Sequence, residues 1–100
     1  MTLLSDSIAK ANGIEGVAIY QVEEGSPSDQ AGLAGIRLTR SRRPRLGDVI
    51  VAVDGKKIRN QQDLYDAFEA VGVGGSVRLT VADGQTDKAR EVRVKLYDVR

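Results

Sequence analysis

Few residues in this 100-residue sequence carry side chains suited to covalent chemistry. The sequence has no His and no Cys, which excludes a Ser-His-Asp triad, a Cys-His pair and zinc ligation by thiolates or imidazoles. A lysine could still activate a serine, but Ser26 precedes Pro27 in a pattern typical of a helix N-cap. Lys56 and Lys57 flank a predicted turn, where a lysine is normally solvated. We therefore expect no catalytic residue in this chain.

Two further patterns have structural explanations. Glu23 and Glu24 are adjacent in a predicted turn, and no apolar residue is placed to separate their pKa values as acid–base catalysis requires. The glycines of 72–75 follow a predicted helix, whereas a phosphate-binding loop precedes one. We predict no cofactor and no metal ion.

The charges indicate which partners to expect. Fifteen basic and 14 acidic residues leave a net charge of +1, which does not favour nucleic acid. Five arginines fall within 37–45, without the interleaved aromatic rings that single-stranded nucleic acid stacks on. We expect 37–45 to be an exposed loop or, second, a contact for an acidic partner, a neighbouring domain or an acidic substrate segment, with nucleic acid third. No apolar run approaches the ~20 residues that span a bilayer, so we expect no membrane insertion.

The hydrophobic pattern predicts one compact domain built mainly from strands. Short β-rich or alternating runs, separated by Gly-rich turns, predict strands at 16–22, 49–53, 77–81 and 92–96. Asp54-Gly55 predicts a tight turn after the second run. A weaker signal predicts a strand stub at 1–4.

Capping residues predict the helices. Ser26 begins a short helix over 27–31, and Asn60 begins a longer one that ends at Gly72. Ser5 is a weaker cap for a helix over 6–11. In the longer helix we expect Leu64, Ala67 and Val71 to face the core. Gln61, Tyr65 and Phe68 form an adjacent stripe, which either edges the core or walls a groove beside an unpaired sheet edge.

An ordered set of motifs resembles the PDZ domains of HtrA/Deg-type, trypsin-like serine proteases. These motifs are Gly16-Val17-Ala18-Ile19-Tyr20-Gln21-Val22, Gly25-Ser26-Pro27, Ala31-Gly32-Leu33 and Leu46-Gly47-Asp48-Val49-Ile50-Val51-Ala52-Val53-Asp54-Gly55. The resemblance covers nearly the whole chain. It implies an α+β, mainly β fold: a five- to six-stranded, partly open β-barrel or sandwich with one short and one longer helix.

The resemblance also implies a peptide-binding groove. A peptide would lie antiparallel to the strand Met1, Thr2, Leu3 and Leu4, facing Gln61, Tyr65 and Phe68, with Glu69 at the rim. The family's carboxylate-binding segment would precede Met1. We therefore expect residues 1–100 to be a single PDZ domain excised from a longer chain and truncated at that segment.

The function implied is capture of C-terminal or unfolded polypeptide segments by β-strand addition. The module would present substrate to, or regulate, an upstream serine protease domain in a periplasmic or otherwise extracytoplasmic, including lumenal, protein. Alternatives are a PDZ domain of another bacterial processing protease or secretion component, and a structural module that docks through Arg37–Arg45.

Overall fold

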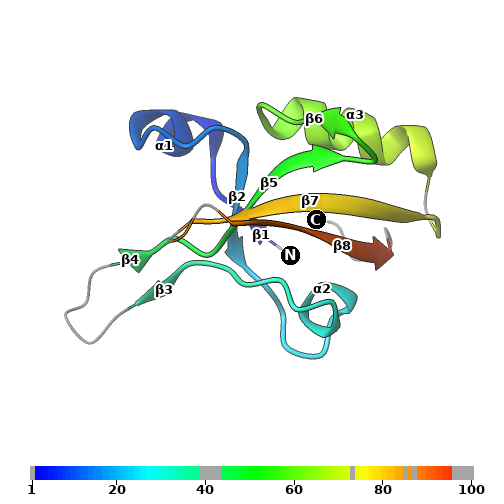
Figure 1. The fold of residues 1–100 in the computed structure, drawn as a ribbon, viewed down its shortest axis with the longest axis horizontal. Helices are drawn as coiled ribbons and strands as arrows, with labels where there is room; N and C mark the ends of the chain where they lie inside the picture. Colours follow the sequence, from blue (N-terminus) through cyan, green and yellow to red (C-terminus); the bar gives the residue numbers. More distant parts are fainter. Residues whose placement is uncertain (1, 39–43, 73, 85, 87, 96–100) are drawn as a thin grey trace.

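The computed structural model describes residues 2–38, 44–72, 74–84, 86 and 88–95. Within these ranges six strands form one antiparallel sheet in the order β1-β2-β5-β7-β8, with β6 paired to β5 (Figure 1). Their bounds are Thr2–Leu3 (β1), Val17–Gln21 (β2), Asp48–Val53 (β5), Lys56–Lys57 (β6), Ser76–Asp83 (β7) and Ala89–Lys95 (β8). A separate hairpin pairs β3 (Arg37–Leu38) with β4 (Pro44–Arg45). The predicted mainly β, partly open architecture is confirmed.

The helices begin where the capping residues predicted. Ser26 Oγ accepts a hydrogen bond from the Asp29 N–H (3.2 Å) at the start of α2 (Pro27–Gln30). Asn60 Oδ1 accepts from the Asp63 N–H (2.9 Å) at the start of α3 (Gln61–Val71). The weaker signal at Ser5 also holds, because its hydroxyl caps α1 (Asp6–Ala11). The described fold thus has a second short helix beside the pair that the resemblance implied.

The hydrophobic core lies between the sheet and the two later helices. Alternating residues of β2, β5, β7 and β8 point inward, and Leu64 and Phe68 of α3 and Leu33 after α2 pack against them. Figure 1 shows α3 above and α2 below the β7–β8 hairpin. Leu33 is 4 % exposed.

One predicted helix face is rotated slightly from its expected position. Val71 was expected in the core but is 40 % exposed, whereas Phe68 is 8 % exposed and belongs to the core. Leu64 is buried as expected, and Ala67 packs partly against the core. The reason is that the sheet meets the centre of α3, and Val71 lies in its last turn, next to Gly72 at the C-cap.

A buried carboxylate joins three distant parts of the chain. Asp48, at the start of β5, is 3 % exposed. Its carboxylate accepts hydrogen bonds from both Nη atoms of Arg90 on β8, each at 2.8 Å. It also accepts the Ala34 N–H (2.9 Å), and Arg90 Nη2 donates to the Gly32 carbonyl (3.0 Å). The pKa of Arg90 is raised by its hydrogen bonds to Asp48. The sequence analysis did not foresee this ion pair.

We predict that Arg90→Met lowers the free energy of unfolding by about 2–3 kcal/mol, because it leaves the Asp48 carboxylate buried and under-bonded. This value is below the range for fully buried pairs because the Arg90 side chain is 43 % exposed. Arg78→Met is the matched control, since its pair with Glu91 is exposed at both ends and should contribute about 0–1 kcal/mol. Equal losses in urea unfolding would contradict the account.

Candidate functional site

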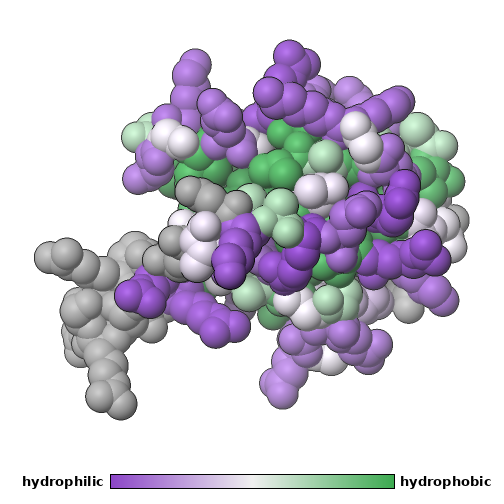
Figure 2. All heavy atoms as spheres, in the orientation of Figure 1, coloured by the Kyte–Doolittle hydropathy of each residue, from purple (hydrophilic) through white to green (hydrophobic). Residues whose placement is uncertain are grey.

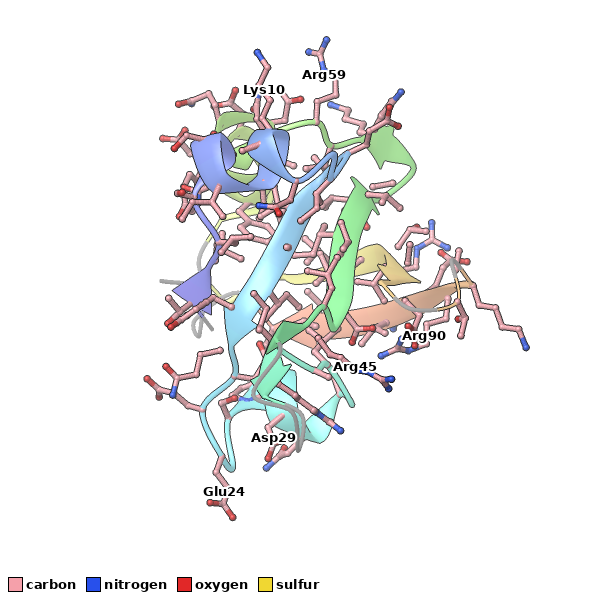
Figure 3. The ribbon with its side chains drawn as sticks, turned by 90° about the vertical axis from the view of Figure 1, so that its left-hand side faces the viewer. Lys10, Glu24, Asp29, Arg45, Arg59 and Arg90 are labelled. Atoms are coloured by element: carbon pink, nitrogen blue, oxygen red, sulfur yellow. The ribbon has the colours of Figure 1, made fainter. Side chains whose placement is uncertain are left out.

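The strand β1 presents an open edge of the sheet. Among the described residues it stands at one end of the strand order, with β8 at the other, and Figure 3 shows it at the left of the view. Leu4 N–H donates to the Ala18 carbonyl (2.9 Å), while Leu3 is the residue paired with Ile19. In an antiparallel ladder this makes Leu3–Ile19 a non-hydrogen-bonded pair. The Leu3 N–H and C=O therefore point away from β2, toward the open edge.

The start of α3 is fastened to the end of β1. Gln61 Nε2 donates to the Leu4 carbonyl (2.8 Å), and the Gln61 N–H donates to Asp6 Oδ1 (3.0 Å). These bonds join residues more than 50 positions apart in the sequence. They fix the first turn of α3 beside the strand whose edge is open.

The other predicted groove residues divide into exposed and buried ones. Tyr65 is 42 % exposed on α3, one turn after Gln61, and Thr2 and Glu69 are exposed. Leu3 is half-buried and packs against the core cluster. Phe68 was predicted to wall the groove, but its side chain is buried in the core. The Phe68 ring therefore packs in the core and exposes little surface to the proposed groove. Met1 lies outside the described residues.

The residues first considered for catalysis are either a helix cap or exposed on the surface. Ser26 caps α2, and Lys56 and Lys57 are exposed on β6. Glu23 and Glu24 are exposed after β2, with Glu24 pointing away from the sheet in Figure 3. The described residues contain no cluster of acidic side chains, or of other metal-ligating types, that could hold a metal ion. They also contain no helix long and apolar enough to cross a membrane.

An apolar hollow of about 670 Å³ lies elsewhere, on the side of β2 that carries Tyr20. It is bounded by α1, by the exposed end of β2, and by Ile36 and Leu46 at the base of the β3–β4 hairpin. The sequence analysis missed it. The available signal was Tyr20, which alternates with the buried Ile19 and so had to point out of the core.

An acidic side chain shapes the start of α3. Asp63 Oδ2 accepts hydrogen bonds from Arg59 Nε and from the Arg59 N–H, both at 3.1 Å. The side-chain bond, reinforced by the backbone bond, lowers the pKa of Asp63 below its ordinary value of 3.8. Together with the Asn60 cap, this network holds the turn that places Gln61.

Comparison with known proteins identifies the family of this domain. The family described as "PDZ domain" matches residues 2–96 of the chain. The chain belongs to the PDZ domain family. The domain is 31 % identical over 91 residues to "Protease Do-like 1, chloroplastic" of Arabidopsis thaliana, and 33 % identical over 97 residues to "Protease Do-like 8, chloroplastic" of the same plant.

The relatives of this PDZ domain are named as proteases. A third, "Putative serine protease HhoB" of Synechocystis sp., is 33 % identical over 78 residues. The matches cover 91 %, 96 % and 78 % of this chain but 20 %, 21 % and 16 % of the respective relatives. The predicted resemblance to the HtrA/Deg type is therefore confirmed, and the chain spans about a fifth of the length of these proteins.

Two aromatic substitutions should separate the groove from the core. Phe68→Ala should lower the free energy of unfolding by about 3–4 kcal/mol, because it empties a buried site. Tyr65→Ala should cost about 1 kcal/mol or less, because Tyr65 is an exposed residue outside the core cluster. Urea unfolding of both variants checks this, and a loss for Tyr65→Ala as large as that for Phe68→Ala would place Tyr65 in the core.

The Asp63 network predicts a pH dependence of stability. Folding lowers the pKa of Asp63, so its contribution is complete above pH 3.8 and is lost as the pH falls through the lower folded-state value. Arg59→Gln should raise the pKa in an NMR titration of the Asp63 carboxylate. Arg78→Gln, in which the arginine is on β7, should leave that titration unchanged. An Asp63 pKa that does not respond to Arg59→Gln would contradict the assigned cause.

Proposed function

We propose that this PDZ domain binds an extended polypeptide segment antiparallel to β1, in a groove between β1 and α3. The observation that carries the proposal is the outward direction of the Leu3 N–H and C=O at an open sheet edge, next to the helix that carries the exposed Tyr65. A peptide strand would satisfy these groups and complete the ladder. Main-chain bonds would supply binding, and side-chain contacts would supply selection.

The side chains around this edge suggest the kind of segment bound. Tyr65 offers an exposed ring and Leu3 an apolar, half-buried surface, and Phe68 belongs to the core cluster against which Leu3 packs. Such a wall suits apolar side chains, including those at a polypeptide C-terminus or in an unfolded segment. The Gln61–Leu4 bond would close the end of the groove nearest the start of α3.

The relatives suggest the setting of this activity. Because they are named as proteases, we propose that the domain presents substrate to, or regulates, a serine protease domain of its parent protein. The carboxylate-binding segment expected ahead of Met1 would belong to that longer chain. The names "chloroplastic" and a cyanobacterial source support a lumenal or other extracytoplasmic site of action.

Fluorescence anisotropy with a dye-labelled peptide that ends in apolar residues tests the proposal. We expect a dissociation constant in the micromolar range, roughly −8 kcal/mol, because a short flexible ligand must be ordered on binding. Tyr65→Ala should weaken binding about tenfold. Tyr20→Ala is the matched control, because it removes a tyrosine of similar exposure, 51 % against 42 % for Tyr65, from the other side of the sheet. Equal affinities of wild type and Tyr65→Ala would overturn the groove assignment.

A further inference from the structure

The apolar hollow beside Tyr20 lies apart from the proposed groove. Leu3 packs against the core, whereas the next residue, Leu4, lines the hollow. On β2, Ile19 likewise faces the core while Tyr20 faces the hollow. Since side chains alternate along a strand, the hollow opens on the face of β1 and β2 that α3 does not cover.

The lining of the hollow is uncharged and mostly apolar. Ile8 and Tyr20 are each 51 % exposed, and Ile36 and Leu46 are half-buried. Two amide side chains, Asn12 and Gln21, supply its polar groups. An apolar hollow with a few polar groups is typical of a binding site. Figure 2 shows apolar surface below α1, with hydrophilic side chains where the hairpin leaves the body.

A basic hairpin continues from two residues that line this hollow, although its own arginines are not among the lining residues. Arg37 and Arg45 directly follow and precede the lining residues Ile36 and Leu46, and both are exposed. They are also directly opposite each other in the β3–β4 pair. Like charges at opposed positions destabilise a strand pair. Figure 3 places Arg45 below the middle of the view and Lys10 of α1 at the top, so these two basic residues lie well apart.

The hairpin sequence contains no acid of its own to balance these arginines. Residues 37–47 contain five arginines and no Asp or Glu. The next residue, Asp48, is buried and already bonded to Arg90 and to the Ala34 N–H. A carboxylate that approaches Arg37 and Arg45 from outside would therefore relieve their repulsion without competing with an internal pair.

We propose that the hollow and the base of the hairpin form a second docking surface, for an acidic polypeptide segment with an apolar anchor. The apolar side chain enters the hollow beside Tyr20, Ile36 and Leu46. Flanking carboxylates lie against Arg37 and Arg45. The surface does not use the open edge of β1, so binding here is independent of the groove proposed above.

NMR titration of the isotope-labelled domain tests this surface. The probe is a short peptide with a Phe–Leu pair flanked by aspartates, acetylated and amidated so that it has no terminal charge. We expect shifts at the amides of Ile36, Arg37, Arg45 and Leu46, with affinity falling as salt rises. Shifts confined to Leu3 and Tyr65, or no shift at millimolar peptide, would overturn the proposal. So would equal shifts with a lysine-flanked peptide or with a short oligothymidylate.

Two variants identify the contributions of charge and apolar contact. Arg45→Glu should weaken binding about tenfold, and it cannot act by opening the hairpin, because it places opposite charges across the strand pair. Lys57→Glu on β6 is the matched control and should bind as wild type. Tyr20→Ser should weaken binding about fivefold or more, with a cooperative thermal transition as proof of folding. An unchanged affinity in Arg45→Glu contradicts the assignment.

Discussion

The buried Asp48 carboxylate determines how the rest of this small domain is arranged. It fixes the point at which the chain enters β5, holds the Ala34 backbone beside it, and connects both to β8 through Arg90. The close approach of Gly47 to the carbonyls of Ala34 and Gly35 leaves no room for a side chain at that crossing. A buried charge of this kind is tolerated because both oxygens of the carboxylate accept hydrogen bonds.

The segments joined by Asp48 lead to both of the surfaces proposed for binding. β5 pairs with β2, and β2 carries the two-residue strand β1 at the edge of the sheet. The same crossing sets Ile36 and Leu46 next to each other at the base of the basic hairpin. The open edge of β1 and the apolar hollow are thus consequences of one packing arrangement. The hollow opens on the face of β1 and β2 that α3 does not cover, whereas the proposed groove lies between the edge of β1 and α3. This arrangement would let a PDZ domain hold a ligand and contact a second segment together.

Sequence reasoning predicted most elements because their signals are local. Caps at Ser26 and Asn60 and the Asp54-Gly55 turn depend on neighbouring residues, and all three appear in the structure. The Asp48–Arg90 pair joins residues 42 positions apart, so no local pattern reveals it. The exchange of Phe68 and Val71 between core and surface has a similar cause: helical spacing gives two adjacent faces, and only the position of the sheet decides which is buried. Met1 and Leu96, part of the predicted terminal strands, lie outside the described residues.

The central claim is that the N–H and C=O of Leu3 face an open sheet edge and form hydrogen bonds with a bound peptide strand. Amide hydrogen exchange followed by NMR, without and with saturating apolar-ended peptide, tests it most directly. The account predicts that Leu4 N–H, bonded to Ala18, is protected in both states, whereas Leu3 N–H exchanges freely alone and slows at least about tenfold with peptide. Protection of Leu3 N–H before any peptide is added, or an unchanged rate at saturation, would contradict the account.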